Sequence, residues 1–203
     1  MSAWHQPRRI AVAAGALTAA IACTTGASWW LIEGDGNVHW VQPGVVVRSA
    51  QPSAARLDDI VRQYHIRSVV NLRGSNRGQA WYDDELAASR ANGLAHFDIP
   101  LSARRELSPD QIDAVLQVVA AAPKPVLIHC KAGSDRTGLV AASWQLAQGV
   151  PAQRAADQLS IRYGHFPWLG SRTVAMDRSF TKLAGRGGFA ASSPGPAGVA
   201  PGP

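Results

Sequence analysis

The stretch VLIHCKAGSDRTG, residues 126–138, decides the fold of this chain. Its apolar start, Val126–His129, is typical of a strand buried in the centre of a sheet. A helical pattern begins at Thr137, so the stretch predicts a strand, a loop and a helix in succession. Cys130 and Arg136 lie at the two ends of the loop. Ligands of α/β sheets bind beyond the carboxyl ends of the strands, so we expect the functional site in this loop.

The predicted loop has the composition of a phosphate site. The backbone N–H groups of residues 131–136 are expected to surround a concavity at a helix N-terminus, where anions bind favourably. Gly133 permits a close turn, and Arg136 can donate two parallel hydrogen bonds to a phosphate. The same groups favour the thiolate of Cys130, which we interpret as a nucleophile directed at phosphorus. An inert buried cysteine is the alternative, and the strand–loop–helix context of the motif argues against it.

Outside this stretch, β-branched runs alternate with helical patterns. Strands are expected at residues 45–49, 67–72, 95–100 and 126–129. Helices are expected after Pro52-Ser53 and Ser108-Pro109, and at residues 81–92, 137–148, 151–163 and 171–183. The alternation predicts an α/β domain of three layers, with a central, mostly parallel sheet flanked by helices.

The composition excludes several classes of protein. A length of 203 residues fits one ordinary domain with extensions. The 2 cysteines are too few for a disulfide scaffold, an all-cysteine zinc site or an iron–sulfur cluster. The net charge of +6 comes almost entirely from arginine and suits an anionic substrate or surface. The arginines are spread along the chain without an aromatic stripe, so we expect no nucleic-acid partner, and we expect a monomer.

The N-terminal segment, residues 1–36, is expected to be a membrane anchor. Arg8 and Arg9 precede a run without charge, Ile10–Ile32, which as a helix would be about 35 Å long and cross a hydrocarbon core of about 30 Å. The arginine pair places the N-terminus in the cytoplasm and the rest of the chain on the periplasmic side of the inner membrane. The alternatives are a cleaved signal peptide and lipid attachment at Cys23, both of which also export the chain.

The C-terminal segment, residues 185–203, consists mainly of Gly, Pro, Ala and Ser. Such a composition cannot bury enough apolar surface to offset the entropy of ordering, so we expect a disordered tail. The interval between the two ends, residues 37–184, is the predicted catalytic domain.

The segment HCKAGSDRTG, residues 129–138, resembles the H-C-x(5)-R-[ST] signature of the cysteine-dependent protein-tyrosine and dual-specificity phosphatase superfamily. Residues 46–52 and 69–74 resemble the first strands of bacterial and plant or fungal members of the dual-specificity branch. The resemblance covers residues 37–184 and implies a dual-specificity phosphatase-like fold. It also implies a metal-independent hydrolase without cofactor, acting on phosphoproteins through a phosphocysteine. The alternatives are an inositol-phosphate or phosphoinositide phosphatase and a non-catalytic phosphate-binding module.

The resemblance also implies roles for single residues. Cys130 would be the nucleophile and Arg136 the phosphate-binding arginine. Thr137 would hydrogen-bond the thiolate and assist breakdown of the phosphocysteine. His129 would support the loop from behind. Arg73 is expected in a supporting role because it lies at a strand end near the predicted site, where it touches a substrate phosphate or pairs with a local carboxylate. The residues expected to bind the substrate phosphate are Lys131, Ala132, Gly133, Ser134, Asp135 and Arg136.

The general acid that protonates the leaving oxygen has three candidates. Asp135 is the first, because an Asp before the loop arginine resembles phosphoinositide phosphatases and some bacterial lipid or tyrosine phosphatases. Asp98, within the strand predicted at residues 95–100, is the second. Glu106, in the following polar segment, is the third, and for it and Asp98 a solvated surface charge is the plain alternative.

Four further positions near the predicted site have expected roles. We expect Arg48 to pair with a local carboxylate, with contact to a substrate phosphate as the alternative, and Asn71 to satisfy backbone groups near the loop. Residues 104 and 105, both arginines, line an entrance for a polyanionic substrate or are simply solvated. For Trp168 we expect packing in the core, with an apolar plug near the site as the alternative.

Overall fold

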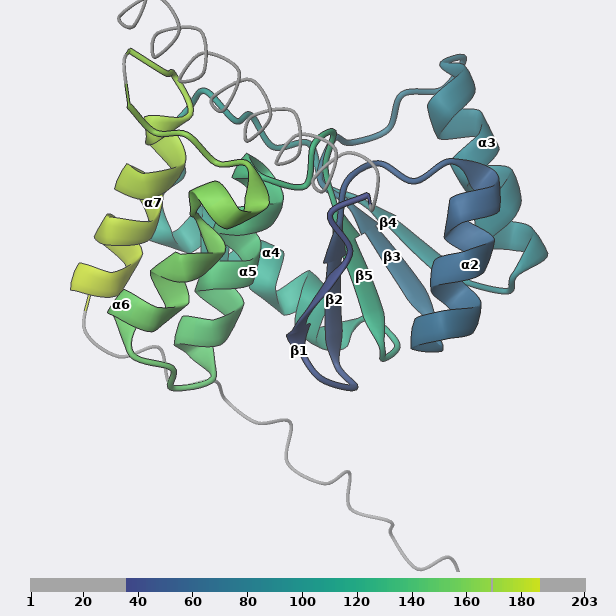
Figure 1. Ribbon diagram of the computed structural model, residues 1–203, viewed down its shortest axis with the longest axis horizontal. Coiled ribbons are helices and arrows are strands. Elements are labelled where there is room, and N and C mark those ends of the chain that lie inside the picture. Colours follow the sequence, from purple (N-terminus) through teal and green to yellow (C-terminus); the bar gives the residue numbers. More distant parts are fainter. Residues whose placement is uncertain (1–35, 169, 187–203) are drawn as a thin grey trace, which may run out of the picture.

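The computed structural model describes residues 36–168 and 170–186, which form a five-stranded sheet between two layers of helices (Figure 1). The strands lie in the order β1-β2-β5-β3-β4. Their bounds are β1 His39–Gln42, β2 Val46–Ser49, β3 Ser68–Asn71, β4 Ala95–Asp98 and β5 Val126–His129. Strands β2, β5, β3 and β4 are parallel, and β1 pairs antiparallel with β2. The sheet is therefore mixed, with the predicted parallel strands at its centre and an antiparallel edge strand that was not predicted.

The two faces of the sheet are covered by different helices (Figure 1). Helices α2 (Ala54–Tyr64) and α3 (Ala80–Ala91) cover one face. The other face carries α4 (Pro109–Ala121), α5 (Asp135–Ala147), α6 (Ala152–Ala155) and α7 (Val174–Gly185). Successive strand residues alternate between the two cores, because side chains of a strand point to opposite faces. The three-layer α/β prediction is confirmed.

The buried strands explain where the functional loop lies. All four residues of β5 are buried, and β5 lies between β2 and β3. Leu127 packs in the core under α2 and α3, whereas Val126 and Ile128 pack under α4, α5 and α7. The chain leaves the carboxyl end of β5 at the middle of the sheet and enters α5 after a short loop. That position is the point at which ligands bind in open parallel sheets.

Two helix starts follow the predicted capping chemistry. The Ser53 hydroxyl oxygen accepts the Arg56 N–H at 3.3 Å and caps α2. Ser108 and Gln111 form a reciprocal capping box at the start of α4, with Pro109 in the first turn. Both helices therefore begin where the sequence predicts them.

The single helix expected at residues 151–163 is wrong. This segment forms the short helix α6 and two 3-10 turns, η1 (Ala156–Gln158) and η2 (Ile161–Tyr163). Two tertiary contacts redirect its backbone. The carbonyl of Gln158 accepts a hydrogen bond from Arg48 Nη1 at 3.0 Å, and it packs against Gly138, where a Cβ would lie only 2.8 Å from it. The hydrophobic periodicity of the sequence predicts neither contact.

Two expectations concern residues that the structure does not describe. The anchor at residues 10–32, with Cys23, and nearly all of the C-terminal tail lie outside the described residues. Within residues 36–168 and 170–186, no helix has the length and apolar character needed to cross a membrane.

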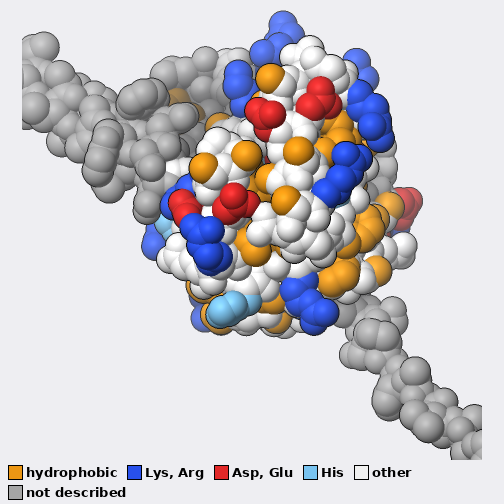
Figure 2. All heavy atoms as spheres, turned by 90° about the vertical axis from the view of Figure 1, so that its right-hand side faces the viewer, with side chains coloured by type: hydrophobic (Ala, Val, Ile, Leu, Met, Phe, Trp, Pro, Cys, Tyr) orange, Lys and Arg blue, Asp and Glu red, His pale blue; other side chains and the backbone are white. Residues whose placement is uncertain are grey.

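The face formed by α2 and α3 has mixed polarity. Lys and Arg side chains lie dispersed over it, with Asp and Glu side chains and hydrophobic ones between them (Figure 2). This face therefore shows no continuous basic stripe of the kind that tracks a nucleic-acid backbone.

Candidate active site

The loop from Cys130 to Arg136 occupies the predicted place between β5 and α5. Cys130 follows the last residue of β5 and is only 2% exposed. In the parallel register, His129 lies opposite Ser49 of β2 and Asn71 of β3. The segments that follow β2 and β3 therefore flank the thiol on both sides. The predicted strand, loop and helix are confirmed.

The carbonyl groups of the loop point away from its centre. Three of them accept hydrogen bonds from donors elsewhere in the chain. The pairs are Lys131 with the Gln51 N–H (3.1 Å), Ala132 with Asn37 Nδ2 (3.2 Å) and Gly133 with Arg48 Nη2 (2.6 Å). Within the described residues, no backbone N–H of residues 131–136 donates to a protein acceptor. Since the carbonyls are held outward, the N–H groups remain available for an anion, as in other phosphate-binding loops.

Gly133 seats the loop against β2. Its φ of 72° lies in the left-handed region that favours glycine. A Cβ at this position would lie 2.7 Å from backbone atoms of Ser49 and Ala50. No other residue allows the loop to approach the β2 backbone this closely.

Arg48 holds the loop from beneath, and its expected pairing with a carboxylate is wrong. Its side chain is fully buried. Besides the Gly133 carbonyl, it donates to the Gln158 carbonyl at 3.0 Å and to Gln158 Oε1 at 2.6 Å, and it lies 3.9 Å from the centre of the Tyr163 ring. Burial lowers the pKa of Arg48 to about 10, against smaller opposing effects of Tyr163 and Cys130. The guanidinium is therefore charged at neutral pH and adds positive potential beneath the thiol.

Arg136 and Thr137 keep polar atoms available for a ligand. Arg136 Nη1 makes long hydrogen bonds to the carbonyls of Leu72 (3.4 Å) and Leu101 (3.3 Å). Its Nε is buried and has no partner among the described residues. The hydroxyl of Thr137 is likewise buried and, in the part of the chain that the structure describes, unpartnered. A buried donor without a partner is costly, which suits atoms that bind a phosphate or a thiolate in the working protein.

His129 is backed by Glu85, which sequence reasoning missed. Glu85, on α3, is 1% exposed, and its Oε2 lies 3.1 Å from His129 Nε2. Its other oxygen lies 2.8 Å from His96 Nε2, and Gln51 Nε2 also donates to Oε2. Burial raises the pKa of Glu85, but the contacts with His129 and His96 outweigh it and lower the pKa to about 2. The available signal was a carboxylate on the buried side of α3, three residues after Tyr82.

Arg73 lies close to Arg136 and Cys130. Its Nη1 donates to Gln51 Oε1 at 2.9 Å, and its guanidinium stacks 3.3 Å from the centre of the Trp81 ring. Burial lowers the pKa of Arg73, and the nearby charge of Arg136 lowers it further, whereas Cys130 raises it. Arg73 therefore adds a second guanidinium close to Arg136.

The three candidate acids have different surroundings. Asp135 begins α5, and its Oδ1 lies 2.7 Å from His165 Nδ1. Asp98 has both oxygens engaged: Asn71 Nδ2 donates to one at 2.8 Å, and the Tyr82 hydroxyl donates to the other. Of these two, Asp135 alone belongs to the phosphate loop.

Glu106 lies on the outside, against α7. It accepts hydrogen bonds from Lys182 at 2.7 Å and Arg178 at 3.3 Å. These bonds lower its pKa, the larger effect coming from Lys182. A carboxylate stabilised in its charged form by two cations is poorly suited to donate a proton.

Four other positions for which the sequence suggested a role are Asn71, Arg104, Arg105 and Trp168. Asn71 Nδ2 donates to the Gly74 carbonyl at 3.0 Å, so it satisfies the backbone after β3, as expected. Trp168 is 51% exposed and packs edge-on against the exposed Phe166, so its expected place in the core is wrong. Arg104 and Arg105 line an open hollow of about 650 Å³ together with Arg172 and Arg178.

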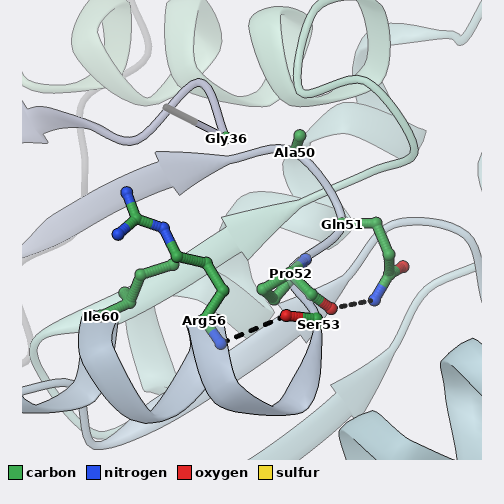
Figure 3. Close-up of a pocket in the computed structure, with 7 residues that line it drawn as sticks. All are labelled: Gly36, Ala50, Gln51, Pro52, Ser53, Arg56 and Ile60. Carbon is green, nitrogen blue, oxygen red and sulfur yellow. Dashed lines mark hydrogen bonds between the residues drawn. The ribbon is translucent and has the colours of Figure 1, made fainter. Parts of the chain in front are cut away.

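A second hollow, of about 310 Å³, lies beside the phosphate loop at the start of α2. Ala50, Gln51, Ser53 and Arg56 contribute to its lining (Figure 3). Figure 3 shows the Gln51 side chain directed away from Arg56, which leaves it on the side where it meets Arg73 and Glu85. Cys130 does not line this hollow, so the hollow is a neighbour of the reactive thiol and not its binding cavity.

Comparison with known proteins gives the family. A family model described as "DSP-PTPase phosphatase fused to NAD+ Kinase" matches residues 34–175, an interval that contains all five strands and the phosphate loop. The chain belongs to this family of cysteine-dependent phosphatases. The resemblance inferred from the signature loop is thereby confirmed at the level of the superfamily.

Two relatives match by sequence. A beta-lactamase hydrolase-like protein of Xylella fastidiosa (strain 9a5c) is 34% identical over 144 residues, which are 70% of this chain and 32% of that protein. The dual specificity protein phosphatase TpbA of Pseudomonas aeruginosa is 28% identical over 149 residues, which are 71% of this chain and 64% of TpbA. The chain therefore spans about a third of the first relative and less than two thirds of the second.

Solved structures match the fold. The crystal structure of P. aeruginosa TpbA has a TM-score of 0.56 at 24% identity and covers 74% of this chain and 89% of that one. The catalytic domain of the PP-IP phosphatase SIW14 from S. cerevisiae has a TM-score of 0.56 at 19% identity, covering 74% and 91%. Both likenesses confirm a dual-specificity phosphatase-like fold.

Proposed function

We propose that this chain hydrolyses phosphomonoesters with Cys130 as the nucleophile and without a metal ion. One observation carries the proposal: the loop carbonyls are held outward, and the free N–H groups lie between a thiol and the guanidinium of Arg136. Donors fixed in advance around the place where charge develops are the largest source of catalysis in such sites. Membership of a cysteine-dependent phosphatase family supports the same chemistry.

The reaction has two steps. In the first, the Cys130 thiolate attacks phosphorus, an S–P bond forms, and the P–O bond to the leaving group breaks. Arg136 and the loop N–H groups hold the non-bridging oxygens, and the leaving oxygen takes a proton from the acid, which we assign to Asp135. In the second step, water attacks the phosphocysteine and returns a proton to Asp135. The Thr137 hydroxyl donates to the departing sulfur, and inorganic phosphate leaves.

The test uses the full-length chain in detergent with an aryl phosphate, a reducing agent and a metal chelator. We expect turnover by the wild type, none by Cys130→Ser, and wild-type turnover by the matched control Cys23→Ser. An inactive wild type would overturn the proposal. Binding of inorganic phosphate without turnover would instead identify a non-catalytic phosphate-binding module.

We propose phosphoproteins, including those with phosphotyrosine, as the substrates. The support is the similarity to TpbA, which is named a dual specificity protein phosphatase and a variant of which has been crystallised in complex with pTyr. A panel of phosphotyrosine, phosphoserine and phosphothreonine peptides and of inositol phosphates tests this. A higher kcat/KM for inositol phosphates than for every peptide would contradict it.

Inositol phosphates are the second candidate substrates, favoured by the pair of guanidinium groups. Arg73 lies close enough to Arg136 for the charge of one to lower the pKa of the other, so a substrate with a second phosphate gains a second cation. If such substrates are used, Arg73→Gln lowers kcat/KM for an inositol polyphosphate more than for a phosphotyrosine peptide. Equal effects on both would remove this candidate.

The N-terminal segment is proposed to anchor the domain in the inner membrane, with the domain on the periplasmic side. The support is the arginine pair followed by the uncharged run at residues 10–32. Protease added to intact spheroplasts should digest the domain, and an intact mass that includes residue 1 excludes cleavage. A mature chain beginning at a lipid-modified Cys23 would replace this proposal by the lipoprotein alternative.

A further inference from the structure

His165 is a buried imidazole held between two carboxylates from different helices. The residue is fully buried. Its Nδ1 lies 2.7 Å from Asp135 Oδ1, and its Nε2 lies 2.9 Å from Asp177 Oδ2. Asp135 is the first residue of α5 and belongs to the phosphate loop, whereas Asp177 lies in the first turn of α7. A single ring therefore connects the phosphate loop to a helix on the outside of the domain.

The two contacts are best satisfied by a ring that carries a proton on each nitrogen. Burial alone lowers the pKa of His165, but the hydrogen bonds and charges of Asp135 and Asp177 together raise it to about 9. These two carboxylates, one from α5 and one from α7, are the charged groups that act on the imidazole. At neutral pH the ring is therefore a buried cation in contact with two partly exposed carboxyl groups.

The contact also distinguishes the two oxygens of Asp135. Oδ1 accepts from the imidazole, so it cannot at the same time hold a proton on that side. Oδ2 has no protein partner among the described residues, which leaves it to carry the acidic proton.

We propose that His165, oriented by Asp177, is a positioning residue that fixes Asp135 beside Arg136 with Oδ2 as the proton donor. The inference rests on the proposed phosphatase function. Its atoms balance with those of the two steps above: the proton on Oδ2 goes to the leaving oxygen and is replaced from the attacking water, and His165 keeps both of its protons. The role of Asp177 corresponds to that of the carboxylates that orient ligand or catalytic histidines elsewhere.

The experiment compares an aryl phosphate, whose leaving group needs little protonation, with an alkyl phosphate, whose leaving group needs a proton. We expect Asp135→Asn to lower kcat on the alkyl ester by about 10²–10⁴-fold, the usual contribution of a general acid. His165→Gln and Asp177→Asn should lower kcat on the alkyl ester at least about tenfold, which is part of the contribution of the general acid. All three variants should change kcat on the aryl ester, and KM on both esters, far less than they change kcat on the alkyl ester.

Two matched control variants separate this effect from general disturbance. His65 is exposed and has a left-handed backbone that asparagine tolerates, and Asp157 is exposed on η1. His65→Asn and Asp157→Asn should leave kcat and KM on both esters unchanged. If folded His165→Gln and Asp177→Asn slow both esters equally or neither of them, His165 serves only the fold and the proposal is overturned.

A second measurement does not depend on activity. NMR titration of the His165 ring should give a midpoint near 9 in the wild type, and a midpoint lower by about one pH unit or more in Asp177→Asn. An unchanged midpoint would show that Asp177 does not act on the ring, and would overturn the proposal even if His165→Gln fails to fold. An inactive wild type with the expected titration would refute the phosphatase function, whereas an active wild type with the unchanged midpoint would refute only the positioning role.

Discussion

Replacing Gly133 by alanine tests how the phosphate loop is seated. The residue has φ +72°, and a Cβ would lie 2.7 Å from the carbonyl carbon and oxygen of Ser49 and from the nitrogen of Ala50. These are backbone atoms at the end of β2, so they cannot rotate away as a side chain would. The loop or the strand must move, and the hydrogen bond from Arg48 to the Gly133 carbonyl moves with it.

The magnitude follows from two separate costs. A left-handed conformation costs a residue with a Cβ about 1–2 kcal/mol, and forcing an extra carbon into a packed site costs about 1–3 kcal/mol. Gly149→Ala is the matched control, because Gly149 has φ +83° but a Cβ added there would meet no atom within 4 Å. The control therefore bears the first cost without the second. Gly133→Ala should lose about 1–3 kcal/mol more free energy of unfolding than Gly149→Ala, out of a total of about 5–15 kcal/mol.

The assays are urea unfolding of the full-length chain in detergent and steady-state turnover of an aryl phosphate. We expect Gly133→Ala to lower kcat/KM at least about tenfold, because misplaced loop N–H groups lose part of their interaction with the phosphate in the transition state. Gly149→Ala should keep wild-type turnover. Equal losses of stability in the two variants, together with unchanged turnover, would refute the seating of the loop on β2.

Three further outcomes are expected. Arg48→Met should lower the free energy of unfolding by about 1–3 kcal/mol for each buried carbonyl that loses its donor. A change in the urea midpoint below about a tenth of the wild-type value would contradict this. Glu85 has a folded-state pKa near 2, so the stability it contributes is complete above pH 4.5 and is lost as the pH falls toward 2. Glu85→Gln should therefore lose less free energy of unfolding than the wild type on acidification. Parallel plots of that free energy against pH for the two proteins would contradict this prediction. His165 has a raised pKa, so the stability it contributes is complete below pH 6.5 and is lost as the pH rises through about 9. This contribution is at most about 3 kcal/mol. Tm should therefore fall more steeply on alkalinisation in the wild type than in Asp177→Asn.

The loop itself could be predicted because its geometry is local. A buried strand that runs into a helix through Gly133 leaves few conformations, and these place Cys130 and Arg136 at the two ends of one turn. The left-handed glycine and the start of α5 agree with that expectation. Chemistry inferred from residues that are neighbours in the sequence is therefore retained in the folded chain.

The residues that hold the loop could not be predicted, because each comes from a distant part of the chain. Asn37, Arg48 and Glu85 reach it only through the register of β2 and β3 with β5 and through the packing of α3 on the sheet. Arg48 illustrates the difficulty: an arginine in a short strand suggests a carboxylate partner, yet its partners are two carbonyls and an amide oxygen. A sequence contains no periodic signal for such contacts.

The placement of charge explains how a phosphate site can contain carboxylates without repelling its ligand. The loop N–H groups, Arg136 and the buried Arg48 make the centre of the site positive. Glu85 faces His129 at the thiol end, and Asp135 faces His165 at the helix end, so each of these two carboxylates is paired with a histidine. Glu85 also contacts His96, so it keeps a partner when His129 is removed, whereas removal of His165 takes the buried cation away from Asp135 beside the bound phosphate. His165→Gln should therefore weaken the binding of inorganic phosphate, even to the inactive Cys130→Ser protein, whereas Asp135→Asn in the same background should not.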